Sequence, residues 1–389
     1  MLKYLGEIGI LYCWKDPEKA EGYFKEAAEV SLATVGPNSA DYEGALQMLR
    51  AIYSRGPQRA NIEWRLKAIE VGRQLMKQHT ESLGIRNERA TGAMWVLAEN
   101  LIPEGKAKEA DEWIGPAAVE FSKAPPETDD DWSSLRNVIK AIRLSPDKEK
   151  HLGILRAIFR AVPKTRQALT AEVEFYRAAN DWPACRNAYR ALVTAFPEAQ
   201  GDWYNRATTA IEFGDVEDYR MCRSEMLKRF GNEEKDGGIL ERVLSMFYLV
   251  TDQWSPAELE SIERVYASLD TVADNGPRSL RTLSRAALAL ADYRLGKVQS
   301  ALEHLNKAPV FGWGIDCAQV LAVTALCHAA LGNYEKAIEA VAASDKALRV
   351  HGPWVDQGDV SRRNYLAKEV TKLIENKSQE KLPTRASTH

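Results

Sequence analysis

The sequence predicts an all-α fold, an α-solenoid in which helical hairpins stack one on the next. The first observation is a turn-and-helix pattern, clearest at residues 331–340 (LGNYEKAIEA), of which variants recur along the chain. The second is a composition with 45% hydrophobic and 28% charged residues, which is typical of a well-packed protein and not of a disordered one. The third is the lack of sustained apolar–polar alternation, which would indicate strands. A chain built from one repeated helical hairpin usually works as a binding surface.

Five of the predicted turns hold a residue that can end a helix in the left-handed conformation. This position is taken by Gly105, Asn180, Gly214, Gly296 and Gly332. A small residue five positions beyond the turn lets the two helices of a hairpin approach closely; it is found as Ala20, Ala110, Ala301 and Ala337. A large apolar residue four positions further and a small one three beyond that complete a stripe at helical spacing.

In chain order, the pattern predicts about nine hairpins and one last helix. The first hairpin turns at residues 15–17, and the first three are spaced nearer 45 than 34 residues, so we expect longer helices there. The remaining matches are good at about 165–197, 280–308 and 315–345, and poor at about 133–161 and 237–273, where the sequence is helical but lacks most of the pattern. The last helix is expected at about 359–375.

The hairpins divide into two predicted arrays. Residues 1–123 form N-terminal hairpins with long helices, and residues 133–375 form a C-terminal array. Between them, residues 124–132 are acidic and Pro-rich, which favours a linker or hinge, although the aspartates at its end could cap the helix that begins near Trp132. Residues 376–389 are polar and aperiodic, so we expect a disordered tail.

The turn, the small residue and the apolar stripe together resemble the tetratricopeptide repeat (TPR), a helix–turn–helix unit of about 34 residues. The resemblance extends from about residue 1 to about residue 350. It departs from the pattern at Tyr219, where alanine is usual, and at Pro17, where an aromatic residue is usual. The resemblance implies a right-handed superhelix with a concave face lined by the first helices. It also implies a non-catalytic scaffold that binds a protein or peptide partner there.

In the register that the resemblance implies, eight residues of first helices would line the concave face. They are Trp95, Glu99, Gln167, Glu174, Arg177, Tyr204, Thr208 and Tyr293. This mixture of aromatic and polar side chains suits an extended peptide or a helix. Alternatively, Trp95 and Tyr204 pack against the neighbouring hairpin, as aromatic residues at helical spacing commonly do.

A narrower resemblance involves residues 219–308. The segments YRMCR at 219–223, MLKRFG at 226–231 and ALALADYRLG at 287–296 look like the C-terminal TPR segment of large bacterial eukaryotic-like serine/threonine protein kinases. This resemblance implies a scaffold in bacterial signalling. It leaves open a regulatory or substrate-docking region of a kinase system whose catalytic domain is not in this chain.

Catalytic motifs are missing from the sequence. It has no P-loop, no GxSxG elbow, no HExxH pair and no protein-kinase motif, so we expect neither an enzyme nor a cofactor or metal site. Arg278, Arg281 and Arg285 form a stripe at helical spacing that is either a phosphate grip or a solvated face. A net charge of -3 favours neither nucleic acid nor a membrane as partner. Five cysteines without a CxxC pair predict reduced thiols and a cytoplasmic location.

Overall fold

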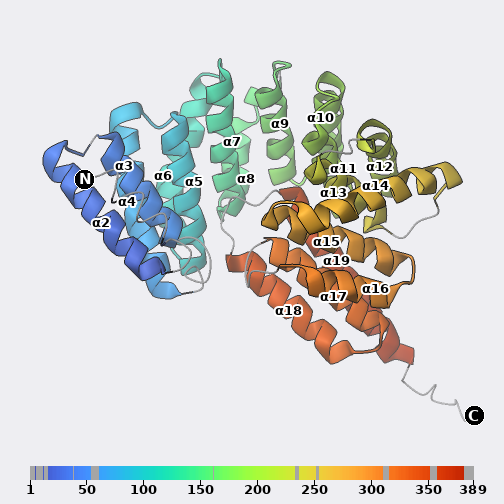
Figure 1. Cartoon of the computed structure of the whole chain (residues 1–389). Coiled ribbons are helices and arrows are strands. Elements are labelled where there is room, and N and C mark those ends of the chain that lie inside the picture. The colour runs from blue at the N-terminus through green and yellow to red at the C-terminus, as the bar shows by residue number, and fades with distance from the viewer. Residues whose placement is uncertain are drawn as a thin grey trace, which may run out of the picture. The chain divides into compact units, whose positions relative to one another are not determined.

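The computed structural model is all-α in the part of the chain that it describes. That part comprises residues 5, 12, 16–37, 39–53, 61–160, 162–232, 236–250, 254–309, 315–350 and 357–380. Within these residues the chain forms eighteen α-helices and two short 3-10 helices, and it forms no strand. The predicted all-α fold of stacked helical hairpins is therefore confirmed (Figure 1).

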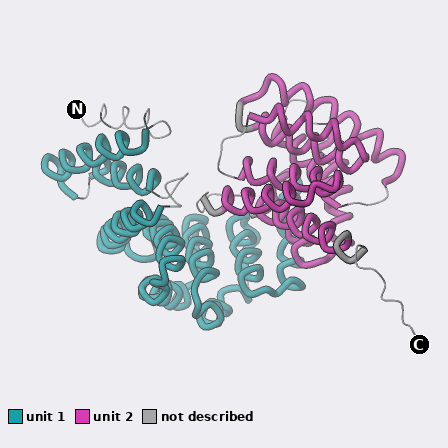
Figure 2. The backbone as a smooth tube through the Cα atoms, turned by 90° about the horizontal axis from the view of Figure 1, so that it is seen from below, with its two compact units in different colours: residues 1–197 teal, residues 198–389 magenta. Residues whose placement is uncertain are grey.

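Two compact units make up the chain, residues 1–197 and residues 198–389 (Figure 2). The helices of unit 1 are α2 (Pro17–Thr34), α3 (Ala40–Tyr53), α4 (Ile62–Leu83), α5 (Glu88–Leu101), α6 (Ala107–Lys123), α7 (Asp129–Leu144), α8 (Lys148–Leu155), α9 (Arg166–Ala178) and α10 (Trp182–Ala195). The helices of unit 2 are α11 (Gln200–Glu212), α12 (Val216–Phe230), α13 (Gly237–Leu249), α14 (Pro256–Asn275), α15 (Arg278–Arg294), α16 (Val298–Lys307), α17 (Ile315–Ala330), α18 (Tyr334–Val350) and α19 (Gln357–Glu380).

The turn inside a hairpin has the same geometry at five places along the chain. Gly105, Asn180, Gly214, Gly296 and Gly332 all have a positive φ, from 54° to 77°. At Gly332, the amide donates to the carbonyl of Ala329 at 3.1 Å, and the next amide, of Asn333, donates to the carbonyl of His328 at 2.9 Å. The other four turns repeat this pair of bonds. It is the Schellman motif, which satisfies the carbonyls that a helix end leaves open.

The position five residues beyond each turn is buried, as the pattern predicts. Ala110, Ala301 and Ala337 are at most 2% exposed. Tyr219 takes the same position in α12, is fully buried, and donates its hydroxyl to the carbonyl of Met246 in α13. The departure from alanine therefore has a structural reason, because the larger side chain ties one hairpin to the next.

The acidic segment before α7 belongs to a helix start. Thr128 caps α7, and the Asp131 carboxylate accepts from the backbone amide of Thr128 in a capping box. Negative charge in the first turn also interacts favourably with the positive end of the helix dipole. A second capping box, formed by Ser255 and Glu258, is present at the start of α14. Residues 124–132 lie inside unit 1, and the division between the units falls after Pro197.

The last helix is longer than the sequence predicts. It runs to Glu380 and includes residues 376–380, which were expected to begin the tail. Residues 381–389 lie outside the described part. Helix α19 packs against α11 and α17, and more lightly against α18 (Figure 1). It therefore joins hairpins at the two ends of unit 2.

Candidate functional site

The first helices of three hairpins in unit 1 pack side by side and bring five of the predicted residues into one region. Helix α7 lies between α5, which carries Trp95 and Glu99, and α9, which carries Gln167, Glu174 and Arg177. Helix α7 contributes two cations that the sequence analysis missed, Arg136 and Lys140. We call the surface formed by Trp95, Glu99, Arg136, Lys140, Gln167 and Glu174 the α7 face.

Lys140 is the centre of the α7 face. Its ammonium nitrogen lies 4.3 Å from the centroid of the Trp95 ring, a cation–π contact. Burial lowers the pKa of Lys140, and the neighbouring Arg136 lowers it further, whereas the carboxylates of Glu174 and Glu99 oppose this shift. A cation held in this way is already partly stripped of water, so an incoming anionic group has less solvent to displace.

Polar contacts hold the rest of the α7 face in place. Arg136 donates from Nη1 to Oε1 of Gln167 at 3.1 Å, which links α7 to α9. Glu99, Gln167 and Glu174 are half-buried, so each keeps part of its surface available. Trp95 is 9% exposed and lies beneath Lys140 in the hydrophobic core, and Arg177 is buried as well. Both side chains therefore lie beneath the α7 face and offer little surface to a partner.

The other three predicted residues lie in unit 2, and two of them are buried. Tyr204 and Thr208 of α11 are 0% and 1% exposed. Tyr204 donates its hydroxyl to Oδ1 of Asp359 in α19 at 2.6 Å. Burial raises its pKa well above the usual range. Tyr293 of α15 is half-buried beside Arg294, and burial raises its pKa to about 12.

Helix α19 is seated on unit 2 through two adjacent arginines. Arg362 donates to Oε1 of Glu241 in α13 at 2.7 Å and also to Gln319 of α17. Arg363 donates to the Ser344 hydroxyl at 2.7 Å, and its guanidinium lies 2.7 Å from Asp345 of α18. Both arginines are at most 4% exposed. The pairing of Arg362 with Glu241 is buried on both sides, whereas the Asp345 side chain is 46% exposed.

A third arginine approaches α19 from the opposite direction. Arg294 of α15 donates to the backbone carbonyls of Tyr248 and Leu249 in α13 at 2.9 Å and 2.8 Å. Its remaining donors reach the carboxylate of Glu369 in α19, at 2.6 Å from Nη2 to Oε2. Near the start of α19, Ser361 donates to Glu212 of α11 at 2.9 Å. We call the surface that holds α19, which includes Tyr204, Glu241, Arg294, Gln319 and Ser344, the α19 seat.

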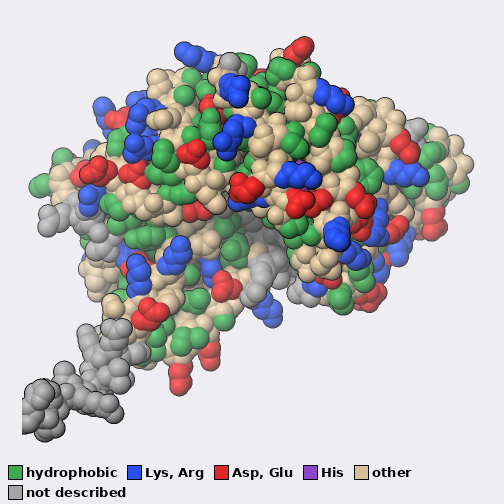
Figure 3. Space-filling model, turned by 180° about the vertical axis from the view of Figure 1, so that it is seen from behind, with side chains coloured by type: hydrophobic (Ala, Val, Ile, Leu, Met, Phe, Trp, Pro, Cys, Tyr) green, Lys and Arg blue, Asp and Glu red, His purple; other side chains and the backbone are tan. Residues whose placement is uncertain are grey.

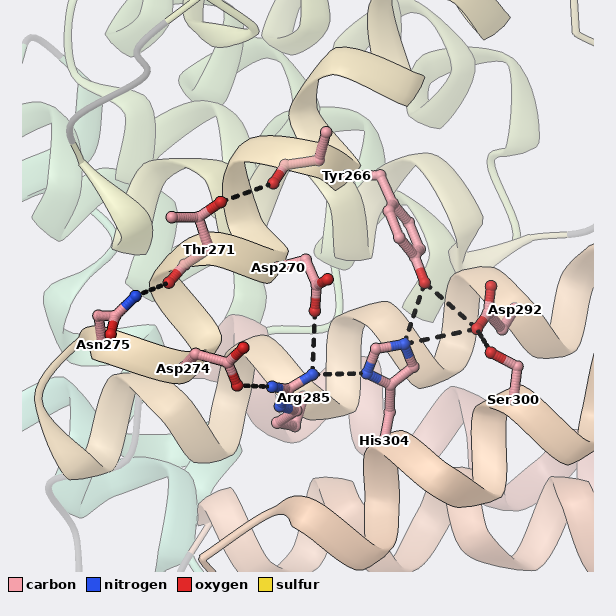
Figure 4. Close-up of polar contacts among 10 residues, drawn as sticks. Tyr266, Asp270, Thr271, Asp274, Asn275, Arg285, Asp292, Ser300 and His304 are labelled. Carbon is pink, nitrogen blue, oxygen red and sulfur yellow. Dashed lines mark hydrogen bonds and ion pairs between the residues drawn. The ribbon is translucent and has the colours of Figure 1, made fainter.

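A cluster of titratable side chains links α14, α15 and α16 (Figure 4). The hydroxyl of Tyr266 lies 3.0 Å from Nε2 of His304 and donates to Asp292 at 3.2 Å. Arg285 donates to Nδ1 of His304 at 2.8 Å, which requires that nitrogen to be unprotonated. Burial, and secondarily Arg285, lower the pKa of His304 against the opposing charge of Asp292. The cluster keeps His304 neutral and ties three helices together.

The same cluster settles the role of one arginine in the predicted basic stripe. Arg285 is 3% exposed and pairs with Asp270 at 3.0 Å and with Asp274. It is therefore neither a phosphate grip nor part of a solvated face. The expectation of a uniform stripe is wrong because the preceding helix, α14, carries two aspartates in its last two turns that pair with Arg285.

One group of side chains could offer three atoms to a metal ion. Asp111, Asp147 and His151 place their ligand atoms within 4.8 Å of one another. The Asp111 carboxylate already accepts from the Ser145 hydroxyl at 2.6 Å and lies 3.4 Å from Nε2 of His151. A structural zinc site uses four ligands. We assign these residues to holding α6 against α8.

The surface carries both signs of charge. On the face shown in Figure 3, Lys and Arg side chains lie among Asp and Glu side chains. In the described part of the chain, no helix combines the length and the apolar character needed to cross a membrane.

Comparisons with known proteins give structural neighbours only. No protein-family model and no curated protein sequence matches the chain. A tetratricopeptide repeat protein from Parabacteroides merdae ATCC 43184 is 14% identical, with 71% of this chain and 98% of that chain covered and a TM-score of 0.42. The TPR domain of P58(IPK) is 13% identical, with 97% and 99% covered and a TM-score of 0.22. The helical-hairpin architecture is established here by the five shared turns.

Proposed function

We propose that this chain is a non-catalytic, TPR-like scaffold that binds a protein or peptide partner through the α7 face. The observation that supports this is the position of Lys140, a half-buried cation over Trp95 with Glu99 and Glu174 nearby. Three adjacent first helices contribute to the surface, and the carboxylates and cations lie within reach of one another. Such a surface offers donors and acceptors to an extended backbone and charges of both signs to its side chains.

The charges on the α7 face define the chemistry of the partner. Arg136, Lys140 and the exposed Arg143 present cations along α7, so the partner segment carries a carboxylate or phosphate there. Glu99 and Glu174 flank these cations and repel a second anion placed over α5 or α9. A segment with one anionic side chain between neutral or basic ones therefore fits better than a uniformly acidic one. Such complementary charges contribute more to specificity than to affinity.

The setting we propose is bacterial signalling in the cytoplasm. The resemblance of residues 219–308 to kinase-associated TPR segments supports it, and the described cysteines are free and buried, as suits a reducing compartment. The same resemblance supports an alternative role as the docking region of a serine/threonine kinase system. A kinase reading frame next to the gene, or in a longer form of the same chain, would favour the alternative.

Selection of peptides from a random phage-displayed library tests the proposal. Peptides enriched on the wild-type chain are expected to carry one anionic residue and to lose binding to the Lys140→Glu variant. The matched control is Lys150→Glu, the same charge change on the exposed face of α8, which should leave binding unchanged. Enriched peptides that bind both variants as well as the wild type would exclude the α7 face as the binding surface.

A further inference from the structure

Helix α19 occupies unit 2 in the way that a bound helical ligand would. Its side chains reach α11, α13, α15, α17 and α18, which include the first helix of every hairpin in unit 2. The contacts span large sequence distances: Tyr204 and Asp359 are 155 residues apart, and Glu241 and Arg362 are 121 apart. Helix α19 thus lies across the hairpins and does not simply extend the stack.

Buried polar side chains contribute to the contacts that hold α19, together with apolar ones. Its buried side chains include Ser361, Arg362 and Arg363, and its fully buried apolar side chains are Leu366 and Val370. By contrast, the side chains that α17 buries between Ile315 and Ala329 are apolar except for Gln319. Ion pairs taken out of water give little net stability, because desolvation offsets their attraction, but they impose strict geometry. The polar contacts of the seat therefore determine which helix can bind there more than they stabilise the bound helix.

We propose that the α19 seat is a recognition site for helices that carry two adjacent arginines, and that α19 is its resident, exchangeable occupant. The partner helix presents the pattern of Asp359, Arg362, Arg363, Leu366 and Glu369 at the same spacing. Glu241 and Asp345 pair with the arginines, Tyr204 with the first acid and Arg294 with the second. This site is separate from the α7 face and does not depend on it.

A glycine at the start of α19 provides a way to open the seat without altering it. A Cβ atom at Gly358 would lie 2.6 Å from Cε1 of Tyr204 and 2.6 Å from Oδ1 of Asn205. Tyr204 is fully buried and hydrogen-bonded, so it cannot move aside. The Gly358→Leu substitution should therefore push the first turns of α19 off α11 while every residue of the seat remains.

Fluorescence polarisation with a labelled synthetic peptide of residues 357–376 tests the proposal on the full chain. The peptide should bind the Gly358→Leu variant at least about ten-fold more tightly than the wild type, whose seat is filled by a tethered helix at high effective concentration. Adding Glu241→Gln, or using a peptide with both arginines replaced by alanine, should remove that gain. The control Gly153→Leu, at a helical glycine with open space around it, should bind as the wild type does.

A folded Gly358→Leu variant that binds no better than the wild type would overturn the proposal, as would binding that is indifferent to the two arginines. If the variant does not fold, amide hydrogen exchange on the wild type decides. Exchangeable seating predicts that α19 amides exchange through a local opening, faster than those of α13 and α17. Exchange of α19 only at the rate of those core helices would make it a fixed structural element and overturn the proposal.

Discussion

Unit 1 and unit 2 are built from the same hairpin but differ in what meets their first helices. In unit 1, half-buried charged groups of α5, α7 and α9 remain partly accessible around Lys140. In unit 2, the first helices are covered by α19, which pairs with α13 and α17 through the buried Arg362. The difference shows that the first helices of a repeat array can be covered by the chain itself when it continues for one more helix.

The comparison also explains why residues of one predicted class have different roles. Trp95 and Tyr204 are both aromatic residues of first helices. Trp95 belongs to the hydrophobic core of unit 1 and has the Lys140 ammonium over its ring, whereas Tyr204 lies against α19 and bonds to Asp359. An aromatic residue in a first helix is therefore not by itself a sign of a partner site.

The largest expected effect is at Tyr204. The Tyr204→Ala substitution should destabilise unit 2 by about 3–5 kcal/mol, because a fully buried ring is lost together with its hydrogen bond to Asp359 of α19. Differential scanning calorimetry would detect this as an earlier transition. Tyr204→Phe keeps the ring and removes only the bond to Asp359, so its cost should be about 1–3 kcal/mol. Equal effects from both variants would contradict the packing role of the ring.

A smaller effect of opposite sign is expected at Asp316, which lies in α17 near Glu241 and Asp359. Burial, and then these two carboxylates, raise its pKa to about 6 from 3.8. Because the folded pKa is the higher one, ionisation destabilises the fold: the penalty is absent below pH 3.8 and fully present above about pH 6. Asp316→Asn should therefore raise the free energy of unfolding by roughly 1–3 kcal/mol at neutral pH.

Chemical denaturation at several pH values measures this effect. The advantage of Asp316→Asn should be near zero at about pH 4 and should grow until about pH 6. Glu339→Gln, on the exposed face of α18, is the control and should show no such growth. An advantage for Asp316→Asn that is the same at every pH would mean that its carboxyl is not buried against α19.

Both units place a small buried residue five positions after the hairpin turn, and this shared packing can be tested at one such alanine in each unit. Ala110→Leu in unit 1 and Ala337→Leu in unit 2 should each cost about 1–3 kcal/mol, because both sites are buried where two helices meet. Thermal unfolding measures both variants. Ala342→Leu lies on the exposed side of α18 and should change little. A loss at only one of the two matched sites would show that the units do not share the same hairpin packing.

Much of the fold can be predicted from the sequence because its determinants are local. A glycine or asparagine that accepts a positive φ, a small residue five positions later and a capping box are each read within a few residues, as at Gly332, Ala337 and Ser255. The seating of α19 cannot be predicted in this way. It depends on side chains that meet across more than one hundred residues of chain, such as Arg362 and Glu241.

The candidate site was predicted in part for the same reason. Trp95, Glu99, Gln167 and Glu174 follow from the repeat register, whereas Arg136 and Lys140 lie in a hairpin that lacks most of the repeat pattern. A signal for them exists: Arg136, Lys140 and Arg143 share one helix face, and six of the other seven residues of segment 135–144 are apolar. Three cations on one face of a helix that lies between two predicted site helices indicate a shared surface. They are better evidence for it than the weak repeat pattern of that hairpin.

The smallest effect on stability is expected at Lys140. This prediction distinguishes most clearly between an accessible surface in unit 1 and a covered one in unit 2. Burial lowers the pKa of Lys140, so its charge is disfavoured in the folded state, and Lys140→Met removes that charge while keeping a side chain that can cover Trp95. The free energy of unfolding should change by about 1 kcal/mol or less, whereas binding of the selected peptides should be lost. Denaturation and fluorescence polarisation measure the two outcomes on one sample. A variant that loses stability but still binds would show that Lys140 is a core residue. The α7 face of unit 1 would then be inaccessible to a partner, as the α19 seat of unit 2 is while α19 occupies it.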